Sequence, residues 1–202
     1  MQTRPFDVVA VETNWVLDVT LHQDEGSEEL LTQAEHGVVQ LFLPSICIAE
    51  SIKRFESIRQ SWVDLERGLK KAAREIMRSP QLRFGEEPFA LAAEALTEIS
   101  GLAEREFWRV LERITRMARL IEPQPETVAR TADIRTFLDL EPADASVLAT
   151  VITARNADVV KKFMSRDGDF QAEDVLGYMR SEGLEYFASA YPIVGPLRRH
   201  MP

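Results

Sequence analysis

Short apolar runs alternate with helical patterns along the chain, and this alternation restricts the fold more than any other feature. Four runs, at 6–11, 38–43, 159–164 and 184–188, are rich in Val, Phe and Leu and end at breaker residues. These runs are typical of strands, and we expect 6–11, 38–43 and 184–188 to be buried on both faces, as in a parallel sheet. Residues 119–121 form a further short candidate strand. Strands that alternate with helices predict an α/β fold with right-handed crossovers.

The helical patterns cover 27–35, 45–78, 88–117, 125–138, 142–155 and 172–181. Pro88, Pro125 and Pro142 fit first-turn positions, and Gly183 fits a C-terminal cap. A segment of about sixty residues, 56–117, contains most of the two longest helices. An ordinary crossover between two strands needs only a dozen or so residues. We interpret this segment as an antiparallel helical hairpin, broken at 79–85 and inserted into a single domain of residues 1–202. Near-helical spacing predicts one apolar face on its second helix, made of Leu91, Ala95, Ile99, Leu102, Phe107, Val110, Leu111 and Ile114.

Composition is that of a globular protein, with 45% apolar and 28% charged residues in a chain of 202. No apolar stretch is long enough for a membrane helix, and no signal peptide is visible, so we expect a cytoplasmic protein without a membrane partner. The single Cys47 agrees with a reducing compartment and is most simply a small buried hydrophobe.

The net charge of −9 argues against general coating of nucleic acid. The charge is unevenly spread, however. Residues 53–83 contain nine Lys and Arg against four acids, whereas 86–126 contain nine Glu against five Arg. Only the first of these segments has a charge suited to a phosphate backbone.

Four acids stand out by their places relative to the apolar runs: Glu12, Glu50, Asp144 and Asp167. Each has a structural explanation when taken alone. Glu12 begins a turn that caps the next helix, Glu50 pairs with Lys53 or Arg54 one turn on, and Asp144 is favoured by a helix dipole. Asp167 or Asp169 forms an Asx-turn or an N-cap.

The four acids together are harder to explain in this way. In open α/β sheets the ligand crevice forms outside the carboxyl ends of the strands, and carboxylates that meet there repel one another unless a cation neutralises them. Oxygen-only sites suit Mg²⁺ or Mn²⁺. The set is therefore the outline of a metal-dependent phosphodiester site.

Four motifs, in order, resemble those of the PIN-domain family of Mg²⁺-dependent nucleases, found in toxin–antitoxin ribonucleases and RNA quality-control factors. They are Val11-Glu12-Thr13-Asn14, the step from Leu43-Pro44-Ser45 to Glu50, the segment 142–150 around Asp144, and the turn 163–170 around Asp167. Together they cover roughly 6–56 and 118–190. The resemblance implies a short sheet of four or five parallel strands, flanked by helices, with an acidic pocket at its carboxyl edge.

The resemblance also implies roles for single residues. Glu12, Glu50, Asp144 and Asp167 would be catalytic and hold one or two Mg²⁺ or Mn²⁺ ions, with Asp169 as a reserve ligand. Asn14 and Ser165 would orient the carboxylates or the scissile phosphate. The basic excess of 53–83, rather than the resemblance, adds Lys53, Arg54, Lys70 and Lys71 as candidate substrate contacts. The expected activity is hydrolysis of phosphodiester bonds, most simply in single-stranded RNA, and an antitoxin or another protein is an expected partner, as is a homo-oligomer.

Two features depart from the family. The first acid is Glu12 where the family usually has Asp, and one extra methylene moves the carboxylate by more than an ångström, which matters to the rigid coordination of Mg²⁺. The hairpin is also larger than in compact toxins, and substrate clamp, dimer interface and partner-docking arm are its three candidate roles. The main alternative is a catalytically silent PIN-like binding module, with Glu12 as the lesion.

Other enzyme classes fit less well. A phosphoaspartate phosphatase needs Asp-x-Asp where this chain has Glu12 and Asn14, and a receiver domain needs an Asp and a late Lys that are not well placed here. Neither a P-loop nor a dinucleotide-binding glycine motif occurs. His22, His36 and His200 have neither zinc-ligand spacing nor a Gly-x-Ser-x-Gly partner.

Overall fold

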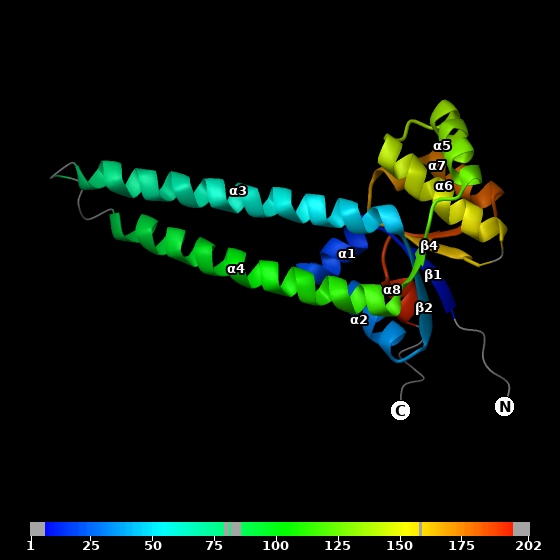
Figure 1. Ribbon diagram of the computed structural model, residues 1–202, viewed down its shortest axis with the longest axis horizontal. Coiled ribbons are helices and arrows are strands. Elements are labelled where there is room, and N and C mark those ends of the chain that lie inside the picture. The colour runs from blue at the N-terminus through cyan, green and yellow to red at the C-terminus, as the bar shows by residue number, and fades with distance from the viewer. Residues whose placement is uncertain (1–6, 79–80, 82–85, 158, 196–202) are drawn as a thin grey trace. The chain divides into compact units, whose positions relative to one another are not determined.

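A computed structural model describes residues 7–78, 81, 86–157 and 159–195 (Figure 1). Its chain divides into two compact units. The first contains the described residues up to Ser51 and from Val110 onward, and the second is Ile52–Arg109.

The first unit is built on a five-stranded sheet in which every pair of neighbours is parallel. Its strands lie in the order β3-β2-β1-β4-β5. The strands are β1 Asp7–Val11, β2 Val39–Pro44, β3 Arg119–Ile121, β4 Lys162–Met164 and β5 Glu185–Phe187. The expected α/β class and parallel sheet are thus confirmed, and 119–121 is indeed a strand. Residue 6 of the first expected strand lies outside the described residues.

Burial follows the position of a strand in the sheet. The central strand β1 ends in Val9, Ala10 and Val11, all fully buried, because helices cover both faces of the sheet there. The expectation that 184–188 is buried on both faces was wrong. In β5, Glu185 is exposed, and Tyr186 and Phe187 are half-buried, because β5 is an edge strand of the sheet.

Two groups of helices flank the sheet (Figure 1). The helices α1 and α2 connect β1 to β2, and they lie with α8 on one side of the strands; α5, α6 and α7 lie on the other. This arrangement is the one that right-handed crossovers give for the observed strand order. The bounds are α1 Thr13–Thr20, α2 Glu25–Glu35, α5 Pro125–Phe137, α6 Pro142–Asn156, the 3₁₀ turn η2 Asp169–Gln171, α7 Glu173–Ser181 and α8 Tyr191–Val194.

Sequence periodicity did not predict α1 or α8. Seven of the eight residues of α1 are buried, so the helix has no polar face and no 3.6-residue alternation to reveal it. The helix α8 is a single turn of four residues. Gly183, by contrast, has the positive φ of +71° expected just beyond the end of α7.

The second unit contains most of two long helices, α3 Ser45–Met77 and α4 Glu86–Met117. Within it the rings of Phe55 and Phe107 stack with centroids 4.2 Å apart, and Arg59 approaches Glu104 at 3.8 Å. These contacts run in opposite directions along the two helices, so the helices are antiparallel. Of the expected break at 79–85, only Gln81 lies within the described residues.

The prediction of one apolar face on α4 was wrong. Phe107, Val110, Leu111 and Ile114 are buried, whereas Leu91, Ile99 and Leu102 are each more than half exposed. Ala93 and Phe107 are buried, and the half-buried positions 96, 100 and 103 connect them at intervals of three or four residues. The apolar residues of α4 therefore occupy two stripes rather than one.

Candidate active site

The first predicted acid, Glu12, directly follows the central strand β1 and is the N-cap of α1. Its side chain is 4% exposed. One carboxylate oxygen accepts a hydrogen bond of 2.7 Å from the Asn14 backbone N–H, as expected for a cap. The other oxygen accepts one of 3.1 Å from the Ser165 hydroxyl, which follows β4. The capping role and the site role therefore coexist in one carboxylate.

The second acid, Glu50, reaches the same region through Thr13. Strand β2 ends at Pro44 and α3 begins at Ser45, so Glu50 lies in the second turn of that helix. The buried Thr13 hydroxyl donates a hydrogen bond of 2.6 Å to Glu50 Oε2. The first residue of α1 thus holds the carboxylate of Glu50.

The third acid, Asp167, follows β4, the neighbour of β1 in the sheet. Its Oδ2 accepts a hydrogen bond of 3.0 Å from the Asn14 side-chain amide. Its backbone N–H donates to the Ser165 hydroxyl at 3.0 Å, and its Oδ1 accepts from the Asp169 N–H at 3.1 Å. The last contact is the Asx-turn expected as the structural explanation. Asp169 itself is exposed.

Electrostatics mark the first acid as unusual. Burial raises the pKa of Glu12 to about 8, against the hydrogen bonds from Asn14 and Ser165, which lower it. The negative charges of Asp167 and Glu50 raise this pKa further. Burial first, and then the charges of Glu12 and Asp167, raise the pKa of Tyr186 to about 12. The negative charges of Glu50 and Asp167 therefore act on Glu12, and a nearby positive charge would stabilise the deprotonated form of Glu12.

The fourth acid, Asp144, is half-buried in the first turn of α6, after Pro142. This helix leads to β4 and packs against β2 and β3. In a strand–helix–strand unit the helix runs antiparallel to the strands, so the first turn of α6 lies toward the carboxyl edge of the sheet. The topology places Asp144 at the correct edge. The hydrogen bonds through Thr13, Asn14 and Ser165, and the effect of charge on the pKa of Glu12, connect Glu12, Glu50 and Asp167. They do not connect Asp144 to these acids, so a ligand role for Asp144 stays a prediction.

The donor set can be compared with the predicted cation. The carboxylates of Glu50 and Asp167 lie close enough to Glu12 to raise the pKa of Glu12, and oxygen ligands of this kind fit a hard divalent ion such as Mg²⁺ or Mn²⁺. As the side chains stand in the described part of the chain, no group of three or more His, Cys, Asp and Glu has the arrangement to hold a metal. Each of the three carboxylates instead accepts a hydrogen bond from this chain.

The predicted substrate contacts divide between the two units. Asn14 and Ser165 bond directly to the acids of the first unit. Lys53, Arg54, Lys70 and Lys71 lie on α3 within the second unit. Lys70 forms an ion pair with Glu66, and Lys71 lies 4.0 Å from Glu75. Their orientation toward the acids stays a prediction.

Sequence reasoning missed three supporting groups. Thr13 holds Glu50, the Tyr186 hydroxyl donates to the Ser165 carbonyl at 2.6 Å, and Arg166 pairs with the buried Asp18 at 3.0 Å. Thr13 stands beside Glu12 in the first motif, so its hydroxyl was a visible signal. Tyr186 and Asp18 gave no signal because their partners are distant in the sequence.

The buried Cys47 thiol lies on α3 close to the same acids. Burial, together with the charges of Glu12 and Glu50, raises its pKa, so the thiol stays protonated. Cys47 is thus the small buried hydrophobe expected from the sequence.

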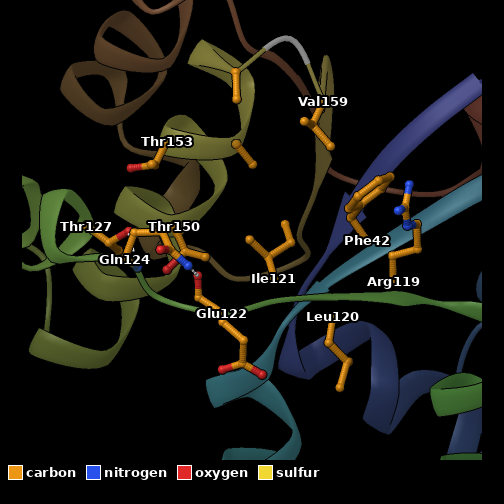
Figure 2. Close-up of a pocket in the computed structure, with 12 residues that line it drawn as sticks. Phe42, Arg119, Leu120, Ile121, Glu122, Gln124, Thr127, Thr150, Thr153 and Val159 are labelled. Atoms are coloured by element: carbon orange, nitrogen blue, oxygen red, sulfur yellow. Dashed lines mark hydrogen bonds between the residues drawn. The ribbon is translucent and has the colours of Figure 1, made fainter.

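A pocket of about 470 Å³ lies elsewhere in the first unit, between α6 and the strands β2 and β3 (Figure 2). Figure 2 shows Phe42, Arg119 and Ile121 on its strand side and Thr150 and Thr153 on its helix side. The hydroxyls of Thr150 and Thr153 both donate to carbonyls of α6, so neither hydroxyl proton is available to a ligand in the pocket. None of the predicted site residues lines the pocket. It is therefore separate from the acids.

Comparisons with known proteins give a distant likeness. No family model and no curated protein matches the chain. Among solved structures, the chain is similar to VapBC2 from Rickettsia felis bound to a DNA fragment from their promoter. The match has 14% sequence identity and a TM-score of 0.46, and it covers 89% of this chain and 97% of the other. A likeness at this level leaves the family of the chain open. Among the described helices, none is long and apolar enough to cross a membrane.

Proposed function

We propose that this protein is a Mg²⁺- or Mn²⁺-dependent nuclease of the PIN-like kind that hydrolyses phosphodiester bonds in single-stranded RNA. The observation that carries the proposal is the burial of Glu12 at the carboxyl end of the central strand, in the field of Asp167 and Glu50. Carboxylates gathered at that edge are unfavourable without positive charge. Capping of α1 explains the hydrogen bond from Asn14 but does not require Glu50 and Asp167 nearby, so a cation-dependent role is the simplest explanation of the group.

The residues of the chain have distinct parts in this proposal. Glu12, Glu50, Asp144 and Asp167 would hold the ion or ions, with Asp169 beside them. A bound divalent ion in such a site supplies an activated water and offsets the charge that develops on the phosphate. Asn14 and Ser165 fix the carboxylates of Asp167 and Glu12, and Thr13 fixes that of Glu50. An antitoxin-like protein partner is part of the same proposal and rests on the motifs alone.

The test is cleavage of a labelled single-stranded RNA with Mg²⁺, with Mn²⁺ and with EDTA. Asp144→Asn and Asp167→Asn should each lower the rate by at least about a hundredfold without loss of folding, because the charge is removed while the shape is kept. Asp139→Asn, an exposed position outside the proposed site, is the matched control and should leave the rate unchanged.

Glu12→Asp is the sharpest variant, because it restores the usual acid of the family. Mn²⁺ should support more activity than Mg²⁺ in the native protein, since its coordination tolerates the longer side chain better. A gain in rate for Glu12→Asp would identify an attenuated nuclease. Absence of cleavage by both forms, with either ion, would refute the proposal in favour of the silent binding module.

A further inference from the structure

The helical hairpin of the second unit exposes large apolar side chains that the proposed nuclease function does not explain. Leu65 on α3 is 54% exposed, and Leu91, Ile99 and Leu102 on α4 are 58%, 51% and 52% exposed. On α4 the exposed positions 91, 95, 99 and 102, which include Ala95, are spaced by four, four and three residues. That spacing places them on one stripe of the helix.

This stripe is separate from the contact between the two helices. Among the buried and half-buried positions of α4 in the same region, 93, 96, 100, 103 and 107 are spaced by three and four residues, and the last of them, Phe107, stacks on Phe55 of α3. Each residue turns the helix by about 100°, so the exposed stripe lies well to one side of this seam. Packing of α3 on α4 therefore leaves the stripe uncovered.

Leu65 lies on the same side of the hairpin as the stripe. The opposite side is marked by the ion pair of Arg59 with Glu104 and by the close approach of Thr97 to Glu66. On α3, Leu65 is one residue before Glu66, so its side chain is rotated by about 100° from that of Glu66. On α4, Ile99 is two residues after Thr97, so its side chain is rotated by about 200° from that of Thr97. Both side chains therefore point away from the side marked by Glu66 and Thr97. Leu65, Leu91, Ala95, Ile99 and Leu102 form what we call the apolar face of the hairpin.

Charges on the edge of this face indicate what covers it. Within the described residues, Arg105 has no ion-pair partner, and neither has Glu87, Glu94 or Glu98; all four are exposed. Arg105 and Glu87 lie five turns apart on the same edge of α4, because 18 residues make five full turns. An antiparallel copy of the same helix would bring the Arg105 of one chain beside the Glu87 of the other, twice.

We propose that the apolar face binds a second copy of this chain, α4 against α4 in antiparallel orientation about a two-fold axis. Leu91 then lies beside Leu102 of the other copy, and Ala95 lies beside Ile99, so a large side chain meets a small one near the axis. At each end of the contact, Arg105 of one copy forms an ion pair with Glu87 of the other. A self-complementary patch of this kind is what a two-fold interface requires. The contact is small, so we expect a dissociation constant in the micromolar range.

The test is the oligomeric state of the full chain, measured by analytical ultracentrifugation from about 1 to 200 µM. The native protein should be a concentration-dependent dimer. Leu102→Asp should weaken the dimer by at least about tenfold, because a carboxylate would be buried against Leu91. Phe137→Asp is the matched control, since Phe137 is 77% exposed on α5 of the first unit, and it should leave the dimer intact. Circular dichroism checks that both variants fold.

Charge variants test the orientation. Arg105→Glu should weaken the dimer several-fold, and the double variant with Glu87→Arg should restore it. In this register Glu98 lies near Glu94 of the other copy, so Glu98→Lys should tighten the dimer by relieving repulsion. A native protein that stays monomeric throughout, a dimer indifferent to Leu102→Asp, or a charge swap without rescue would each overturn the proposal. These readouts do not involve cleavage, so their failure is distinguishable from failure of the nuclease function.

Discussion

At the scale of single residues, Glu12 combines a structural and a chemical property. Its two carboxylate oxygens accept hydrogen bonds from Asn14 and Ser165, which favour the charged form, yet burial still raises its pKa to about 8. At neutral pH, and without a cation, this carboxyl is largely protonated. Binding of a cation and deprotonation of Glu12 are therefore linked, because a metal ligand must lose its proton.

Stability in EDTA should consequently fall as the pH rises. The folded-state pKa of Glu12 lies above the ordinary value of 4.5, so folding favours the protonated form. That contribution is complete below pH 4.5 and is lost as the pH rises through about 8, at up to about 1.4 kcal/mol per pH unit. Urea unfolding at several pH values should show this decline. Glu12→Gln should remove it, whereas Glu126→Gln, at an exposed position, should keep it.

Added Mn²⁺ extends this prediction. A bound cation favours the deprotonated carboxylate, so the increase in unfolding free energy on adding Mn²⁺ should be larger at pH 8 than at pH 6. The same increase at both pH values would show that Glu12 does not contact the ion.

Thr13 should position Glu50. Thr13→Val keeps the shape of the side chain but removes the hydroxyl, and a hydrogen bond to a charged group is worth about 1.5–3 kcal/mol. We expect a decrease in unfolding free energy of that size at pH 7, measured by urea denaturation, and a matching loss of any Mn²⁺-dependent stabilisation. Thr13→Ser keeps the hydroxyl and should restore most of both. Equal behaviour of the two variants would contradict the positioning role.

At the scale of secondary-structure elements, the sequence predicted the strands and helices that have a regular apolar pattern, and it missed a helix that is buried on all sides. The strands and six of the helices were recognisable from apolar runs, proline and glycine. Helix α1 was not, because burial of nearly every side chain removes the polar alternation. The two stripes of α4 were taken for one face, since spacing alone does not say which apolar side chains meet a neighbour.

The candidate site shows the same limit. Acids that directly follow strands, such as Glu12, could be placed at the carboxyl edge from the sequence. The Thr13 hydroxyl stood in the first motif, but its partner Glu50 could not be assigned, and neither could the contact of the Tyr186 phenol, because these contacts join elements that are far apart in the sequence.

The outer face of α3 should bind nucleic acid. Arg67, Lys71, Arg74 and Arg78 repeat at intervals of four, three and four residues and line one shallow cavity with Glu75. Reversing Lys70, Lys71 and Arg74 to Glu should weaken RNA binding, and it should flatten the plot of log affinity against log salt by about 0.7 for each phosphate that is no longer neutralised. Fluorescence anisotropy with a labelled RNA measures this slope. Arg135→Glu, at an exposed position on α5, is the control, and an unchanged slope for the triple variant would contradict the prediction.

At the scale of the whole molecule, the two units differ in how their backbone is protected. The first unit surrounds a sheet whose central residues, such as Val9, Leu41 and Phe163, are fully buried. The second unit has two long helices and one seam between them, and among its described residues the large buried side chains are Phe55 and Phe107. Local opening free energies follow such differences in burial.

Hydrogen exchange followed by mass spectrometry should therefore separate the two units. Amides of β1 and β2 should exchange slowest, and those of α3 beyond Leu65 and of α4 before Ala93 should exchange at least about a hundredfold faster, because few buried side chains hold those turns. Phe107→Ala should speed exchange throughout the hairpin, since loss of a buried Phe costs about 3–5 kcal/mol, while leaving β1 nearly unchanged. Trp108→Ala, at the neighbouring half-exposed position, should have a much smaller effect. If Phe107→Ala accelerates exchange equally in β1 and in the hairpin, the chain opens as one cooperative unit, and the hairpin is not a separate folding element.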